Sequence, residues 1–205
     1  EKAGSDKMDQ KNQFYAYHHL AYSTYERRYS DENAQSSFYN QFPIYLDSSK
    51  TRDKAYQSSL SNTLKLVYAN RYARLSAGLA HSFLQYAYVS PDQGDITDFD
   101  LLKKRNYNNT SINGSLSLHI DTNFSFNADA RYYLLGFKKG DFYMNGTLSQ
   151  SIGNNILTIK GNYHRYEPDY FFQHYHSNHF HWNQSLSKIR KIQAEARFHL
   201  DSWRT

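Results

Sequence analysis

The sequence has no cysteine and only three prolines and nine glycines among its 205 residues. Without cysteine there can be neither a disulfide framework nor a thiolate metal site. The sequence also lacks any apolar run of about 18 residues, which excludes a transmembrane helix. No apolar stretch occurs between Glu1 and Lys11, so no signal peptide is recognisable there. The strongly polar mean hydropathy of −0.85 still permits transmembrane strands, because these hide apolar residues among polar ones.

The sequence also has no excess of acidic residues. Its 24 lysines and arginines outnumber its 19 aspartates and glutamates, and the net charge is +5. A basic balance of this kind is one mark of nucleic-acid binding. The basic residues are scattered, however, and their densest groups, Arg27-Arg28 and Lys103 to Arg105, fall in sequence that resembles loops. We therefore expect no nucleic-acid partner.

Aromatic residues make up 17% of the chain, and many of them take part in a period-two pattern. Between Ser111 and Ile120 the even positions are apolar or glycine, and the odd positions are polar. After Asp121-Thr122 the alternation resumes and continues to Leu134. Successive side chains of a strand point to opposite faces, so these two runs predict a tight hairpin with one apolar face.

The same alternation predicts an antiparallel up-and-down meander of about nine long strands and no helix. The first strand, near 13–29, is too aromatic on both faces for a face to be assigned. The other expected strands lie near 60–66, 75–83, 111–120, 124–134, 142–152, 157–162, 180–186 and 192–200.

The expected connections alternate in length. In chain order they are long (30–56), short (70–71), long (89–109), short (121–122), medium (136–140), short (153–155), long (166–178) and short (187–190). A meander places alternate connections on opposite rims, so one rim should carry short turns and the other long loops. Outer-membrane barrels have this asymmetry, with short periplasmic turns and longer extracellular loops.

Alternation alone also fits a soluble β-sandwich or a lipocalin-like barrel that binds a ligand inside. Three features indicate that the apolar face contacts lipid rather than a soluble protein core. The strands reach about ten residues, near the nine to eleven that cross a bilayer. The polar face is rich in serine, asparagine and threonine. Aromatic residues gather near strand ends, as in an interfacial belt: Tyr68, Tyr72, Tyr86, Tyr88, Tyr132, Tyr133, Phe137, Phe142 and Tyr143.

The two faces give two sets of candidate residues. We expect the lipid-facing set to include Leu116, Leu118, Phe124, Phe126, Leu148, Leu157 and Phe198. We expect the pore-lining set to include Lys65, Arg74, Asp129, Arg131, Asp141, Lys160, Lys191, Glu195 and Arg197. Cations outnumber acids in the second set, which predicts a weak preference for anions. The alternative is that these charges form ion-pair ladders with little net field.

Motifs for catalysis or cofactor binding are lacking. There is no Gly-x-Ser-x-Gly elbow and no glycine-rich phosphate loop, so we expect neither an enzyme nor a cofactor. His179 and His181 would share a face of a strand and could hold Zn²⁺ or Cu²⁺. Apart from Asp169 or Glu167, no carboxylate or cysteine stands at a spacing that completes such a site. We interpret the two histidines as polar loop or lumen residues.

Several motifs resemble the Bacteroidetes family described as “putative porin”. Loose matches run from Phe38 to Thr51, from Asn62 to Leu66 and from Tyr132 to Phe142. The most specific match follows Pro168-Asp169-Tyr170 and comprises Ser177, Asn178, His179, Phe180 and Trp182, similar to the family's Ser-Asn-His-Phe-x-Trp signature. The resemblance implies an outer-membrane barrel longer than this chain, with this sequence as a later portion, and passive transport of solutes.

Together these patterns predict an all-β protein, a partial or complete transmembrane β-barrel over 13–200, between a polar N-terminal segment (1–12) and a short tail (201–205). An odd number of strands conflicts with the even number of single-chain bacterial barrels, so we expect an incomplete barrel. The expected partners are the outer-membrane bilayer and small hydrophilic solutes. A non-conducting barrel whose long loops bind a partner is the alternative, and the oligomeric state is left open.

Overall fold

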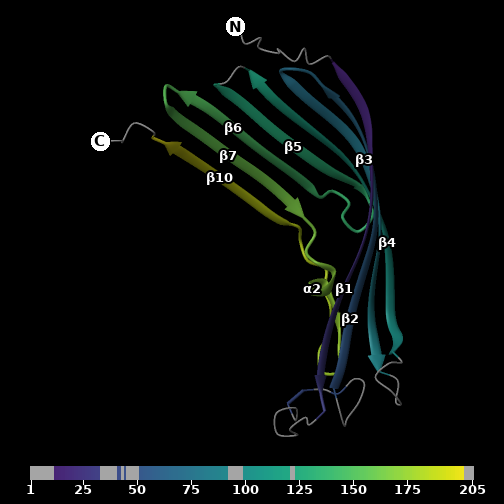
Figure 1. Ribbon diagram of the computed structural model, residues 1–205. Coiled ribbons are helices and arrows are strands. Elements are labelled where there is room, and N and C mark those ends of the chain that lie inside the picture. Colours follow the sequence, from purple (N-terminus) through teal and green to yellow (C-terminus); the bar gives the residue numbers. More distant parts are fainter. Residues whose placement is uncertain are drawn as a thin grey trace, which may run out of the picture.

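The computed structural model describes residues 12–32, 41–42, 44, 51–91, 99–120 and 123–200 (Figure 1). Its main sheet has eight strands: β1 (Gln13–Asp31), β2 (Thr51–Ala69), β3 (Ala73–Pro91), β4 (Phe99–Ile120), β5 (Phe124–Leu135), β6 (Phe142–Ile152), β7 (Asn155–Tyr166) and β10 (Ile189–His199). A helical turn, α2 (Tyr170–Gln173), and a small hairpin of β8 (His174–His176) and β9 (His181–Asn183) complete the fold. No helix in these ranges is long and apolar enough to cross a membrane.

The main sheet is an antiparallel meander, as the alternation predicted. Each strand up to β7 pairs with the next strand in the chain, and β7 pairs with β10, which gives the order β1-β2-β3-β4-β5-β6-β7-β10. The predicted pairing around Asn70-Arg71 is confirmed, with Leu60 opposite Phe83 and Leu64 opposite Leu79. Within the described part of the chain the sheet is open, and β1 and β10 are its two edges.

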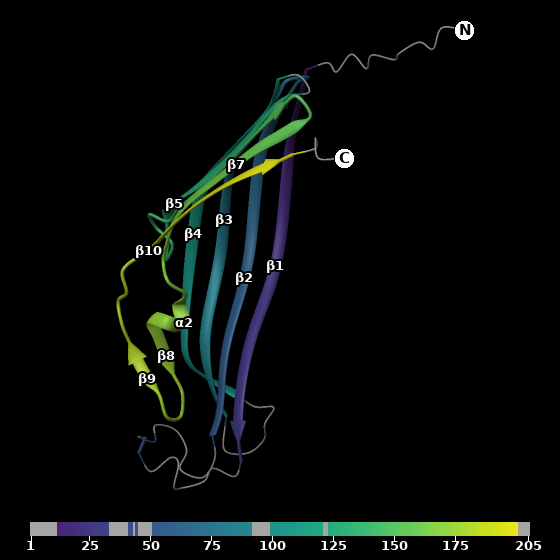
Figure 2. The ribbon, with the colours of Figure 1, turned by 90° about the vertical axis from the view of Figure 1, so that its left-hand side faces the viewer.

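The strands fall into two length classes. The first four contain 19, 19, 19 and 22 residues, whereas β5, β6, β7 and β10 contain 12, 11, 12 and 11. In Figures 1 and 2 the long strands therefore continue well past the rim where the short strands end. We call this extension, made of the end of β1, the start of β2, the end of β3 and the start of β4, the projecting wall.

Two predicted loops are wrong because of this wall. The sequence predicted loops over 30–56 and 89–109, but β2 already begins at Thr51 and β4 at Phe99. Both faces of the wall break the expected pattern. Polar residues such as Ser58 and Gln85 replace the apolar ones on the outer face, and Leu84 replaces a polar one on the inner face. The period-two signal disappears although the strands continue.

The predicted sheet strand at 180–186 is also wrong. Only His181–Asn183 is extended there, and it pairs with His174–His176 in the separate two-stranded sheet. Strand β10 instead pairs directly with β7, so residues 167–188 leave the sheet and return to it. We call residues 167–188 the inner segment. Over the described residues the main sheet thus has eight strands rather than nine.

The connections have the predicted asymmetry. Asn70–Tyr72 and Gly153-Asn154 form short turns at the rim where β1 begins and β10 ends (Figure 1). In the first of these turns, Asn70 Oδ1 accepts the backbone N–H groups of Tyr72 and Ala73 at 2.9 and 2.8 Å. The longer connections lie at the opposite rim. The Asp121-Thr122 turn, residues 1–11, the 201–205 tail and most of the 38–51 match lie outside the described residues.

The turn between β5 and β6 requires glycine at its first position. Gly136 has φ +91°, and a Cβ there would lie 2.2 Å from the carbonyl oxygen of Asn108. Asn109 Oδ1 accepts the backbone N–H of Lys138 at 3.0 Å, which ties the same turn to β4. The turn is therefore fixed against the base of the projecting wall.

Candidate functional site

The outer face of the sheet carries an apolar band of nearly constant height. It covers residues 60–68 on β2, 75–83 on β3, 112–120 on β4, 124–132 on β5, 144–152 on β6 and 192–200 along β10. Each stretch has the length of a tilted transmembrane strand, about nine to eleven residues. Leu118, Phe126 and Leu148 lie directly opposite one another in this band.

All seven residues predicted to face lipid lie on this outer face. Leu157 and Phe198 are cross-strand partners, Leu116 is opposite Leu75, and Phe124 is opposite Ile120. Large apolar side chains here are solvent-exposed, Ile192 to 75% of its surface. Polar side chains interrupt the band near its edge, where His18 Nε2 lies 2.7 Å from Asn62 Oδ1.

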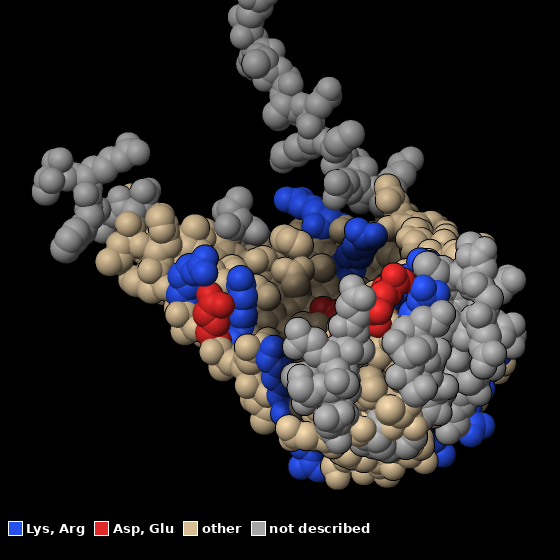
Figure 3. Space-filling view, turned by 90° about the horizontal axis from the view of Figure 1, so that it is seen from below, with Lys and Arg blue, Asp and Glu red and all other residues tan. Residues whose placement is uncertain are grey.

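The opposite face is polar, hollowed and charged (Figure 3). All nine residues predicted to line a pore have the positional parity of this face. One row of directly opposed residues runs through seven strands: Lys65, Gly78, Asn113, Arg131, Tyr143, His164 and Lys191. A parallel row holds Arg74, Ser117, Asn127, Thr147, Lys160 and Glu195. Asp129 lies opposite Asn145, and Arg197 opposite Thr158.

The charges on this face are unevenly paired. Glu195 forms an ion pair with Arg197 at 3.0 Å, and Asp129 accepts the side-chain N–H of Asn145 at 2.9 Å. Lys65, Arg131 and Lys191 make no ion pair within the described chain. The row that holds these three cations therefore has a net positive charge. Its β2–β6 part lines a hollow of about 400 Å³.

Asp141 differs from the other predicted pore residues. Its side chain is fully buried and cannot face an open channel, which corrects the expectation for this residue. Its Oδ1 accepts Lys188 Nζ at 2.5 Å and the backbone N–H of Glu167 at 2.9 Å. Lys188 also binds Glu167 Oε2 at 2.8 Å, so this lysine joins both ends of the inner segment to the β5–β6 turn.

Burial and pairing act in opposite directions on the two charged groups of this contact. Burial raises the pKa of the Asp141 carboxyl, and the nearby Lys188 ammonium only partly offsets this rise. Burial alone would lower the pKa of Lys188, but its bonds to Asp141 and Glu167 raise it above the ordinary value. Lys188 is therefore held in its charged form.

The inner segment folds back over the polar face of the projecting wall (Figure 2). Asp169 begins α2 by accepting the backbone N–H of Phe171 at 2.9 Å. The Tyr170 ring stacks on Tyr86 with centroids 4.3 Å apart, and Phe171 contacts both Tyr86 and Tyr88 edge-on. These buried rings form the aromatic core of the structure.

The interfacial belt predicted for the rim is therefore wrong for Tyr133, Phe137 and Tyr143, which lie on the polar side of the sheet. It is also wrong for Tyr86 and Tyr88. Both have the parity of the polar face, and both are buried beneath the inner segment. The sequence contained a signal for this arrangement. Leu84, Tyr86 and Tyr88 occupy three successive inner-face positions of β3, where a strand that faces a water-filled lumen should be polar. Another part of the chain must therefore cover them.

The Ser-Asn-His-Phe-x-Trp motif anchors the β8–β9 hairpin of the inner segment to β2. Asn178 donates its backbone N–H to Asp53 Oδ1 at 2.7 Å and its side-chain N–H to Thr51 Oγ1 at 3.1 Å. His179 Nε2 lies 2.9 Å from the same Thr51 oxygen. These contacts join positions more than 120 residues apart in the sequence. The motif therefore has a structural role in this chain.

The remaining motif residues stabilise the hairpin itself. Ser177 N–H donates to Phe180 O at 2.8 Å, and Phe180 N–H donates to Ser177 Oγ at 3.0 Å. Trp182 stacks on Tyr175 at 4.3 Å and donates its indole N–H to Phe172 O at 3.0 Å. Phe180 and Trp182 line an apolar recess of about 520 Å³ next to β1.

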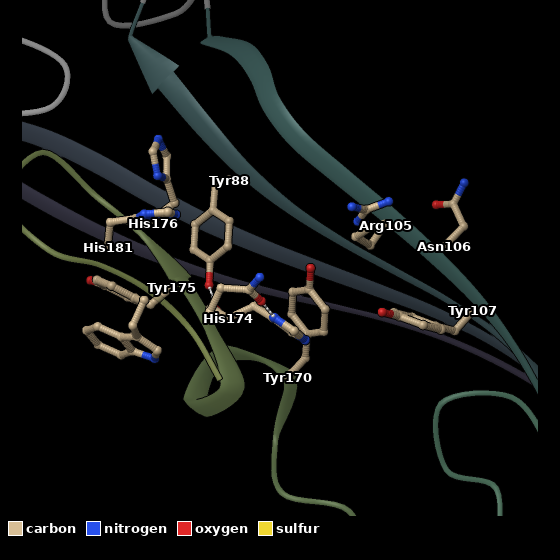
Figure 4. A pocket seen from close by; sticks show the side chains of 11 residues that line it. Tyr88, Arg105, Asn106, Tyr107, Tyr170, His174, Tyr175, His176 and His181 are labelled. Carbon is tan, nitrogen blue, oxygen red and sulfur yellow. Dashed lines mark hydrogen bonds between the residues drawn. The ribbon is translucent and has the colours of Figure 1, made fainter. Parts of the chain in front are cut away.

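A pocket of about 400 Å³ lies between the inner segment and β4 (Figure 4). Arg105, Asn106 and Tyr107 line it from β4. Tyr170, His174 and His176 line it from the inner segment, and Tyr88 from β3. Tyr88 donates its hydroxyl proton to the backbone oxygen of His174, as the figure shows. The pocket combines aromatic rings with amide, imidazole and guanidinium groups, a lining suited to polar organic solutes.

The histidines do not assemble the metal site considered from the sequence. His179 is directed to Thr51, whereas the ring of His181 lies 4.9 Å from that of His176. Over the part of the chain that the structure describes, no group of three or more histidine, aspartate or glutamate side chains is arranged to hold a metal ion.

Comparison with known proteins gives one match. A family model described as “putative porin” matches residues 3–205, almost the entire chain. No curated protein and no solved structure matches the chain.

Proposed function

The chain belongs to this porin family, and from that premise we propose that it forms a wall of an outer-membrane channel for the diffusion of small hydrophilic solutes. The proposal includes the Bacteroidetes relationship that the Ser-Asn-His-Phe-x-Trp motif suggests. It assigns no catalytic residue and no cofactor.

The observation that carries the proposal is the combination of the two faces of the sheet. The outer face has an apolar band about as tall as the hydrocarbon core, and the inner face has polar rows at the same level. In a soluble β-sandwich the apolar face would be covered by a second layer, but here large side chains such as Leu64, Leu79 and Ile112 are about half exposed. Hydrocarbon is the environment that such a face requires.

The direct test is electrical. We expect the purified protein to insert into planar lipid bilayers and to produce discrete conductance steps in potassium chloride. We also expect the folded protein to need detergent and to resist heat until boiled. A protein that stays monodisperse in plain buffer would contradict the membrane assignment and favour the soluble ligand-binding alternative.

The second candidate function is a non-conducting barrel. One observation favours it: the inner segment occupies the hollow side of the sheet and is held there in two places. Lys188 holds its first and last residues, and Asn178 holds its hairpin. A detergent-dependent, heat-resistant protein that gives no conductance steps would select this function over the channel.

A further inference from the structure

Two arginines lie directly opposite each other on the outer face, at the edge of the apolar band. Arg165 on β7 pairs with Arg190 on β10, and the β6 partner of Arg165 is Phe142. The next row into the band holds Met144, Tyr163 and Ile192. In the opposite direction along the strands, the next pair is Tyr166 and Ile189, at which β7 ends and β10 begins. The arginines therefore mark the boundary of the band at the rim of the longer connections.

Like charges at directly opposed positions of an antiparallel pair are destabilising. Neither arginine forms an ion pair within the described chain. Of the nearest carboxylates in the sequence, Asp141 and Glu167 are held by Lys188 on the other side of the sheet. Asp169 begins α2. The repulsion between the two guanidinium groups is thus not offset by an ion pair with any carboxylate in the described part of the chain.

The neighbourhood is that of a membrane interface. The Phe142 and Tyr163 rings lie 5.9 Å apart on the same face, and Tyr132 is the β5 partner of Phe142. Aromatic residues with one apolar side and one polar end concentrate at the level of lipid headgroups. A guanidinium group binds phosphate oxygens through two parallel N–H donors, a geometry that an ammonium group does not offer.

We propose that Arg165 and Arg190 form a binding site for the phosphate of a lipid headgroup in the outer leaflet. The acyl chains of this lipid would pack on the apolar surface of Met144 and Ile192. The phosphate would neutralise both arginines at once and so remove their repulsion. The inference rests on the proposed function only in requiring that the sheet spans the outer membrane, since solute passage through the hollow plays no part in it.

Lipid binding can be measured in neutral detergent micelles by native mass spectrometry. The probes are palmitoyl-oleoyl phosphatidic acid, whose phosphate is unshielded, and palmitoyl-oleoyl phosphatidylcholine, whose phosphate is shielded by choline. We expect the unmodified protein to bind phosphatidic acid about tenfold more tightly than phosphatidylcholine. The R165Q/R190Q double variant should lose this preference.

The matched control is Arg197→Gln, which removes a cation from the same strand β10 but on the inner face, so it should keep the preference. Folding of the double variant is checked by thermal unfolding: without lipid it should be at least as stable as the unmodified protein, because the repulsion is gone. Phosphatidic acid should raise the midpoint of the unmodified protein only.

Two results would overturn the inference. One is an equal preference for phosphatidic acid in the unmodified protein and the double variant. The other is full displacement of the lipid by an equal concentration of inorganic phosphate, which would indicate a simple ion site. A protein that conducts but has no lipid preference would refute this site alone, and one that has the preference but does not conduct would refute the channel alone.

Discussion

Neighbouring side chains on a single strand meet opposite environments. On β5, Phe126 belongs to the outer band between Leu118 and Leu148, whereas the adjacent Asn127 is exposed on the inner face between Ser117 and Thr147. The two positions have the same backbone setting and nearly the same depth. They therefore form a matched pair for separating lipid contact from general disturbance of the strand.

Phe126→Arg should lower the free energy of unfolding by about 2–4 kcal/mol, the cost of placing arginine on the lipid face near the bilayer midplane. Asn127→Arg should cost much less, because its charge stays in the polar hollow. Unfolding in guanidinium chloride in the presence of lipid vesicles measures both values. Equal losses for the two variants would show that the faces are wrongly assigned.

The buried carboxylate of Asp141 depends on one partner. Lys188→Ala would leave this carboxylate buried without a counter-ion, which costs about 3–5 kcal/mol for a fully buried pair and less where water can enter. We expect hydrogen exchange to become faster across the inner segment. Adding Asp141→Asn to Lys188→Ala should restore part of the protection, because a neutral amide does not need a counter-ion. Lys139→Ala, a change at an exposed neighbouring lysine, should have no effect.

Among the larger elements, the inner segment depends on contacts far away in the sequence. Its α2 turn and its hairpin are too short to be stable alone, and they are held by stacking on Tyr86 and by the Asn178 contacts with β2. Alternation could not predict this arrangement. The pattern of Phe180, Trp182 and Leu186 mimics a sheet strand, although only three residues there are extended.

Asn178→Ala removes the side-chain hydrogen bond to Thr51 and leaves a buried hydroxyl with one partner fewer. The expected cost is about 1–3 kcal/mol, confined to the inner segment. Amides between 174 and 183 should exchange faster while those of β5 and β6 do not change. If the protein conducts, its single-channel conductance should rise, because a loosened segment obstructs the hollow less. Gln184→Ala, at an exposed position of the same segment, is the control. Uniform destabilisation of the sheet would contradict a local role.

For the sheet as a whole, the sequence predicts most of the apolar band and little of what lies beyond it. Leu118, Phe126 and Leu148 could be assigned to one face because apolar residues occupy every second position there. The projecting wall has water on one face and the inner segment on the other, so Ser58 and Tyr86 follow no simple alternation. The arginine pair was not predicted, because it depends on the direct pairing of β7 with β10.

The polar rows predict the ion selectivity of the proposed channel. Lys65→Glu combined with Arg131→Glu reverses two charges in the row with the net positive charge. The reversal potential in a potassium chloride gradient should shift towards the value for cations. Lys104→Glu, an equal change on the outer face of the projecting wall, should leave it unchanged. An unmodified channel that prefers cations would show that paired charges dominate the hollow.

The unequal strand lengths have a consequence for how a cell would present this protein. If the apolar band lies in the bilayer, four strands carry hydrogen-bonded backbone far into the surrounding medium, stiffened by the aromatic core on their inner side. The surface met by antibodies or phages is then a rigid β-scaffold as well as loops. Exchanging loop sequences alone would leave much of that surface recognisable.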